Sequence, residues 1–231
     1  MKQTALTMIT MVSALLLPQA ALAFPVDFGP GFTTHRVNVD GDVVSVTVGG
    51  HGPAVVLIHG YAADSRMWKP LAIALALHFT VIAPDLPGIG NSAIPAGGSN
   101  MSYAARRVRD AVHALGYQRA SVVGPTHSLS LADREGYVAA YSRPGRMAAG
   151  WAYFDSFPQT AVDFARLATT KLPMPVLSIG GDKANGAALG TQVRAVAESV
   201  TVVVLKNTGH WLMEENPQQT IPALTKFLES H

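Results

Sequence analysis

The stretch PAVVLIHG, residues 53–60, decides how this chain folds. It is a continuous apolar run that ends in glycine, as expected for a strand buried on both faces of a parallel sheet. FTVIAPD (79–85) and SVVG (121–124) have the same character, and helical patterns lie between them at 63–77 and 101–116. Strands that alternate with helices in this way predict an α/β fold with a mostly parallel sheet flanked by helices.

The pattern extends in both directions from this region. Upstream, HRVNVDG (35–41) and VVSVTVGG (43–50) alternate polar and apolar residues and meet at Asp40-Gly41, which predicts a β-hairpin. The downstream segments are a strand at 174–182, a helix at 189–199, a strand at 200–209 and a closing helix at 216–230. No internal repeat or interdomain linker interrupts them.

The length and composition of the chain exclude several classes of function. A chain of 231 residues can bury a full core, and we expect one domain over residues 24–231. The net charge is only +2, without a run of Lys or Arg, which argues against a nucleic-acid partner. There is no cysteine, so disulfides, zinc–thiolate sites and a cysteine nucleophile are excluded.

The N-terminus has the features of an export signal. Lys2 precedes an apolar run at 4–17, and Ala21-Leu22-Ala23 fits the small-x-small cleavage pattern. These features predict a signal peptide over residues 1–23 and a mature chain that begins at Phe24 in the periplasm or outside the cell. The alternative, a membrane anchor, is disfavoured because the run is short for a membrane span. We expect no stable membrane association after cleavage.

Four short motifs occur in an informative order, namely LIHG (57–60), PDLPGIGNS (84–92), SVVG (121–124) and TGHW (208–211). Together they resemble the α/β-hydrolase superfamily, from about Phe24 to the C-terminus. Within it the chain looks most like secreted bacterial epoxide hydrolases of the Cif type, through FPVDF, HFTVIAPDLPGIGNS, GHWLMEE and the cap-like YSRPGRMAAGWAYF.

The resemblance implies a function as well as a fold. Epoxide hydrolases of this type open a small apolar epoxide with a carboxylate, and a water activated by histidine then hydrolyses the ester. The fold would be an α/β-hydrolase with a helical cap that roofs an apolar site. It implies no metal and no organic cofactor.

His210 is the candidate general base. It follows a strand late in the chain, where this superfamily places its catalytic histidine. Asp182 follows the strand run PVLSIGG (175–181) and is the candidate acid that would orient the imidazole. Some relatives carry this acid after the preceding strand, and a loop aspartate is often only a turn former. Glu214 and Glu215 are expected to be solvated charges.

The turn His59-Gly60-Tyr61 is the candidate oxyanion hole. In the superfamily such a turn aims a backbone N–H, here that of Tyr61, at the oxygen on which negative charge develops. The alternative is a plain turn between a strand and a helix, with Gly60 needed only for its geometry.

The expected nucleophile is missing. Directly after SVVG an epoxide hydrolase would carry Asp and an esterase Ser, but residues 124–128 read GPTHS and place Thr126 there. Threonine is stiff at Cβ and suits neither the strained elbow nor this chemistry. The sequence therefore jumps from the strand into cap sequence, and it omits the elbow helix, one strand and the front of the cap. We expect a reduced helical cap at about 125–170.

Two further aromatic residues, Tyr153 and Trp68, could line a site. Tyr153 lies in the cap, where relatives use tyrosines to protonate the epoxide oxygen, although Phe154 matches that position more directly. Packing at the boundary between cap and core is an equal alternative for Tyr153. Trp68 is expected to be a core residue.

Three functions remain open from the sequence. The first is epoxide hydrolysis, and the second is another reaction of the same fold, by a dehalogenase or an esterase. The third is an exported, non-catalytic remnant that binds a small apolar ligand. Because an interior strand is missing, its two neighbours must either pair directly or leave backbone groups unpaired.

Overall fold

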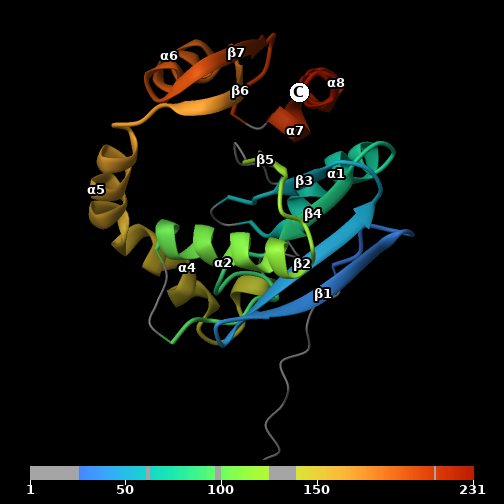
Figure 1. Ribbon diagram of the computed structural model, residues 1–231, viewed down its shortest axis with the longest axis vertical. Helices are drawn as coiled ribbons and strands as arrows, with labels where there is room; N and C mark the ends of the chain where they lie inside the picture. The colour runs from blue at the N-terminus through green and yellow to red at the C-terminus, as the bar shows by residue number, and fades with distance from the viewer. Residues whose placement is uncertain (1–25, 61–62, 97–99, 125–138, 211) are drawn as a thin grey trace, which may run out of the picture.

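The computed structural model describes residues 26–60, 63–96, 100–124, 139–210 and 212–231 (Figure 1). The strands are β1 (Phe32–Val39), β2 (Asp42–Gly50), β3 (Ala54–Leu57), β4 (Thr80–Pro84), β5 (Ser121–Val123), β6 (Leu172–Gly181) and β7 (Ala197–Leu205). The helices are the 3-10 helix η1 (Ser65–Trp68) and the α-helices α1 (Lys69–Leu75), α2 (Met101–Ala114), α4 (Arg146–Asp155), α5 (Phe157–Leu167), α6 (Gly186–Val196), α7 (Leu212–Glu215) and α8 (Pro217–Glu229). Within these ranges no helix combines the length and the apolar composition that a membrane crossing requires.

The central sheet has five strands in the order β1-β2-β4-β3-β5. β1 and β2 form the predicted hairpin, whose turn at Asp40 and Gly41 has positive φ angles of 48° and 86°. β2 pairs antiparallel with β4, whereas β3 lies parallel to both β4 and β5. The expected α/β fold is confirmed, and the parallel strands are those that α1 and α2 connect.

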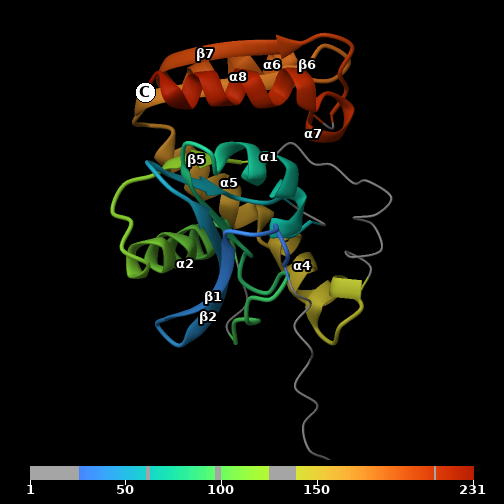
Figure 2. The ribbon, with the colours of Figure 1, turned by 90° about the vertical axis from the view of Figure 1, so that its right-hand side faces the viewer.

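Helices cover both faces of this sheet, as Figure 2 shows for α1 and α2. Because side chains alternate along a strand, Val55 and Leu57 of β3 point to one face and pack in a cluster with Leu71 of α1. Val56 points to the other face and shares a cluster with Val108 of α2. The apolar run of β3 is therefore buried on both sides, as its sequence predicts.

The C-terminal third forms a second, smaller sheet. β6 and β7 pair in parallel, and α6 packs against both strands. The predicted helix at 189–199 ends earlier, at Val196, because Ala197 already pairs with Leu172 of β6. Met213 and Leu224, on α7 and α8, join the cluster around β3 and α1. Side-chain packing thus attaches this part to the central sheet.

The two sheets are not joined by a backbone ladder. β5 pairs only with β3 and β6 only with β7, so the sheet is interrupted between β5 and β6 (Figure 1). Among the described residues no strand lies between them in the chain. The interruption lies where the sequence predicts a missing strand, and the first of the two expected outcomes, direct pairing of its neighbours, is not observed between β5 and β6.

Helices α4 and α5 lie in the expected cap region. Ala149 and Tyr153 of α4 are buried against the core, whereas α5 buries none of its residues. Figure 1 shows α5 as a column that links α4 to β6. The described part of the cap is therefore thin, and its second helix leaves large apolar side chains exposed.

Candidate active site

The loops that follow β3 and β5 start side by side. Leu57 pairs with Val123, and the backbone N–H of Ile58 donates to the carbonyl oxygen of Val123 over 2.8 Å. Since parallel strands end at the same edge of a sheet, the turn after β3 and the chain after β5 begin at one place. Tyr61 and Thr126, the predicted oxyanion donor and the residue at the nucleophile position, lie outside the described residues.

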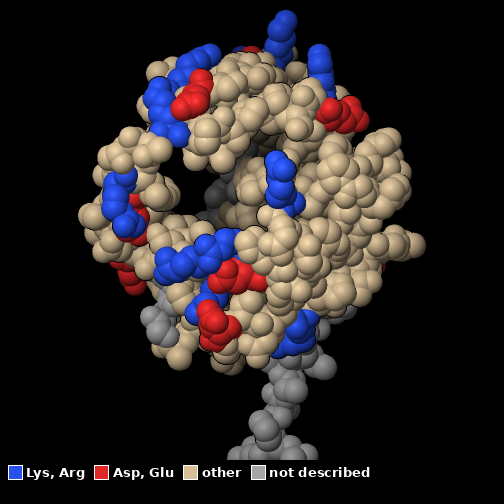
Figure 3. Space-filling model, viewed as in Figure 1, with Lys and Arg blue, Asp and Glu red and all other residues tan. Residues whose placement is uncertain are grey.

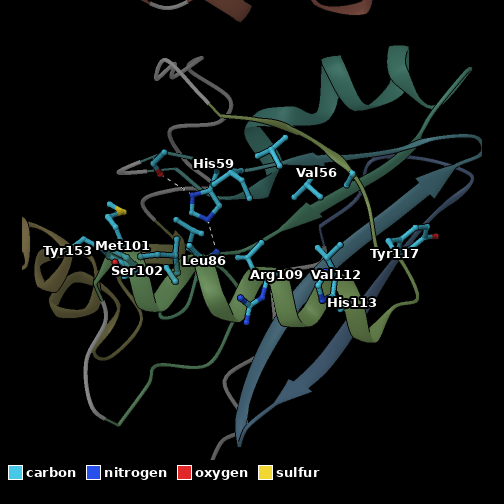
Figure 4. A pocket seen from close by; sticks show the side chains of 18 of the residues that line it. Val56, His59, Leu86, Met101, Ser102, Arg109, Val112, His113, Tyr117 and Tyr153 are labelled. Carbon is cyan, nitrogen blue, oxygen red and sulfur yellow. Dashed lines mark hydrogen bonds between the residues drawn. The ribbon is translucent and has the colours of Figure 1, made fainter. Parts of the chain in front are cut away.

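His59 is a buried residue with both ring nitrogens engaged (Figure 4). Its Nε2 accepts a 2.8 Å hydrogen bond from the backbone N–H of Leu86, so the ring proton is on Nδ1. Nδ1 then donates to the carbonyl oxygen of Gly60 over 3.0 Å. These bonds tie the turn to the end of β4, and His59 supports the turn and is not placed as a base.

Asp182 and His210 lie on loops that follow the neighbouring strands β6 and β7. Asp182 Oδ1 accepts a 3.1 Å hydrogen bond from the N–H of Thr208, and the N–H of Lys183 donates to the Thr208 carbonyl over 2.9 Å. The loops touch so closely that a Cβ on Gly181 would lie 2.0 Å from the Thr208 oxygen. Hydrogen bonds and close backbone contact therefore hold the loops after β6 and β7 together.

The surroundings of Asp182 favour its ionised form. Hydrogen bonds from backbone N–H groups, first that of Asn207 and then that of Thr208, lower the pKa of the Asp182 carboxyl, against a smaller desolvation effect. A carboxylate in this position can stabilise a charged imidazole nearby.

Glu215 is exposed, as expected, and it also holds the loop that carries His210. Its Oε2 accepts a 2.6 Å hydrogen bond from the backbone N–H of Gly209, directly before His210. Met213 lies in the same hydrophobic cluster as Leu57 and Ala63. In the sequence, Leu57 precedes the His59–Gly60 turn and Ala63 follows it. The exposed His210 is thus on a loop anchored by Glu215, in a part of the chain packed near the end of β3.

A buried acidic pair near this edge was not foreseen from the sequence. Asp85, at the end of β4, accepts hydrogen bonds from the N–H groups of Ser65 and Asn91 at 2.9 and 2.8 Å. Burial, and then the Asp64 carboxylate, raise the pKa of Asp85. Asp64 caps η1 and forms a 2.5 Å ion pair with Arg66. The only sequence signal was an acid directly after an apolar strand, and its role here is to organise loops.

Tyr153 is 5% exposed, and its hydroxyl donates a 2.8 Å hydrogen bond to the carbonyl oxygen of Pro87. That bond ties the cap to the loop after β4. Phe154 instead packs between Trp151 and Phe157 with tilted rings, whose centroids lie 5.6 and 4.9 Å from its own. Trp68 is buried in the core, as expected.

A cavity of about 790 Å³ adjoins the turn after β3. Figure 3 shows the molecule hollowed between α5 and the central sheet. Figure 4 shows His59 at one side of the cavity and residues of α2 along its floor. In the described part of the chain no three His, Asp or Glu side chains gather as metal ligands would.

The fold and the loops at the strand ends define a class. The chain has the α/β-hydrolase fold, and the sequence pattern of the alpha/beta hydrolase fold family matches residues 53–129. It is similar to a soluble epoxide hydrolase from Corynebacterium sp. (strain C12), with 24% identity over 84% of this chain and 96% of that protein. The Cif epoxide hydrolase from Acinetobacter nosocomialis has a similar structure, with a TM-score of 0.76, 18% identity and coverage of 87% of this chain and 90% of that one.

This chain is shorter than the Corynebacterium enzyme over the aligned region, and part of it also resembles a dehalogenase. The alignment with the Corynebacterium enzyme runs over 277 positions, whereas 84% of 231 residues is about 194, so this chain lacks a long stretch of that protein. A fluoroacetate dehalogenase from Burkholderia sp is 36% identical over 41% of this chain, which covers 33% of that protein. The chain is thus a hydrolase by resemblance, and part of the Corynebacterium enzyme has no counterpart in it.

Proposed function

We propose that this chain hydrolyses small apolar epoxides, with His210 as the base that activates water. The observation that carries the proposal is the locked pair of loops after β6 and β7. Asp182, held ionised by backbone N–H groups, lies on the first loop, and His210 lies on the second. The similarity to epoxide hydrolases supports the choice of substrate class.

The chain's own residues support direct addition of water. Residues 124–128, GPTHS, offer no carboxylate that could form an ester intermediate. His210 would take a proton from water while the water oxygen bonds to a ring carbon and the carbon–oxygen bond of the epoxide breaks. The alkoxide then takes a proton from the imidazolium, so that epoxide and water give a diol. Asp182 would stabilise the imidazolium.

The test compares substrates of the three reactions left open. Purified protein is incubated with styrene oxide, a short nitrophenyl ester and fluoroacetate. We expect diol from styrene oxide and a loss of about 10²-fold or more in the His210→Ala variant, in line with removal of a general base. The matched control is His231→Ala, because this exposed histidine bonds only to Ser230 and Phe227. Turnover of the ester or of fluoroacetate alone, or of no substrate, overturns the proposal.

We also propose that the mature protein is exported. The support is the basic start, apolar run and cleavage pattern in residues 1–23. Expression in a Gram-negative host followed by N-terminal sequencing of the periplasmic fraction should return Phe24. Full-length chain retained with the membranes would contradict export by cleavage.

A further inference from the structure

We use the name α2 hollow for the part of the cavity described above that α2, β5 and α5 line. Figure 4 shows Val56 of the central sheet and Val112 of α2 beside it. Its apolar walls are Val56 and Val122 from the sheet, Val108 and Val112 from α2, and Phe164 and Leu167 from α5. The cavity's volume of about 790 Å³ falls within the range of small-molecule sites, roughly 300–1,000 Å³.

Large apolar side chains are exposed into this hollow. Val122 is 69% exposed, Phe164 58% and Leu167 61%. Val122 lies on β5, and Phe164 and Leu167 lie on α5. Burying such side chains against an apolar ligand is favourable, because each apolar area removed from water contributes to binding.

The charged groups around the hollow are basic. Arg109, His113 and Arg119 line it, and the described lining contains no Asp or Glu. Arg109 is partly engaged, since its Nε and Nη2 donate to Asp110 at 2.9 and 2.7 Å. Arg119 is exposed and makes no ion pair with the described residues. An anionic group beside Arg119 would meet a cation that no carboxylate of the described residues pairs with.

We propose that the α2 hollow binds a single-chain alkyl carboxylate, with its chain among the valines of α2 and β5 and its carboxylate at Arg119. This binding goes beyond the proposed function, because it requires neither an epoxide nor His210. The apolar side chains of α2, β5 and α5 suit an unbranched alkyl chain, and the basic groups beside them select an acid over an alcohol or an amine.

Calorimetric titration tests the ligand class. Octanoate, decanoate and dodecanoate should bind with affinity that rises about fourfold per methylene, which corresponds to the transfer free energy of one buried CH₂. Decanol and decylamine should bind at least about tenfold more weakly than decanoate at low salt, because each lacks the charge-assisted contact. Equal affinity for decanoate and decanol, or absence of a chain-length effect, overturns the proposal.

Three variants locate the site. Arg119→Gln should weaken decanoate about tenfold and leave decanol unchanged, whereas the matched control Arg194→Gln, on α6, should change neither. Ala105→Trp should fill the hollow, because Ala105 lines it and is exposed into it on α2. Circular dichroism checks that this variant folds. Wild-type affinity in Arg119→Gln and in a folded Ala105→Trp would place the ligand elsewhere and refute the site.

The His210→Ala variant separates this inference from the proposed function. It should lose epoxide turnover and keep decanoate affinity. If neither the wild type nor the variant turns over styrene oxide but both bind decanoate, only the hydrolase proposal is refuted. Turnover without any decanoate binding would refute only the α2 hollow.

Discussion

Replacing Gly181 by Ala should separate the two loops of the candidate active site. A Cβ at this position would lie 2.0 Å from the carbonyl oxygen of Thr208 and 2.3 Å from that of Gly209. Both obstacles are backbone atoms, so no side-chain rotation relieves them. Reaching an ordinary contact of 3.4 Å requires a shift of about 1.4 Å in the loop that carries His210.

The change in the free energy of unfolding of Gly181→Ala is the sum of two opposing effects. Overpacking of this kind costs about 3 kcal/mol, at the upper end of the usual range because the backbone must move. The lower entropy of the unfolded alanine chain returns roughly 0.4–1 kcal/mol. The free energy of unfolding should therefore fall by about 2 kcal/mol, which lowers the urea midpoint by about 1 M at a slope of about 2 kcal/mol/M. Epoxide turnover should fall by about 10²-fold, because the base moves by more than 1 Å.

Gly124→Ala is the matched control for the unfolding experiment. A Cβ at Gly124 meets no atom of the described residues within 4 Å, and its φ is not in the left-handed region. The free energy of unfolding of this variant should therefore stay within about 0.5 kcal/mol of wild type. The reasoning is refuted if Gly181→Ala unfolds at the wild-type urea concentration, since the two loops could then not be in the contact described.

Three other substitutions test separate parts of the structure. Tyr153→Phe should cost about 1 kcal/mol in urea unfolding, because the carbonyl oxygen of Pro87 loses its donor, and an unchanged midpoint would contradict that bond. Arg66→Met should cost about 3 kcal/mol at pH 7, because Asp64 becomes a buried charge without its partner, and a stabilised variant would contradict this. Asp182→Asn should unfold earlier than wild type at neutral pH. Because the pKa of Asp182 is lowered in the fold, that difference should persist above about pH 4 and vanish as the pH falls through the folded pKa; a difference independent of pH would exclude this origin.

The regular elements could be predicted where local chemistry and tertiary packing agree. The continuous apolar run at 53–58 requires burial on both faces, and β3 has it. Asp40-Gly41 suits the positive φ angles of a tight hairpin turn. Ala197, Glu198 and Ser199 were expected to be helical, but their pairing with β6 outweighs this weak local preference.

The candidate site was only partly predictable, because its bonds join distant segments. His59 and Asp182 could be named from their place after buried strands. The bond between His59 and Leu86, 27 residues apart, and that between Glu215 and Gly209 depend on how the loops fold back. No pattern of residue types in one stretch of sequence encodes such contacts.

The interruption between β5 and β6 has a consequence for how the molecule comes apart. Backbone hydrogen bonds run through all five strands of the central sheet, but they do not cross to the pair β6–β7. Met213 and Leu224 join the two parts through side-chain packing. Such contacts can break while the backbone hydrogen bonds within each sheet stay intact. In native-state amide exchange, β7 should therefore open at a lower free energy than β4, as a separate cooperative unit. The C-terminal third, which carries both Asp182 and His210, would then unfold before the central sheet does.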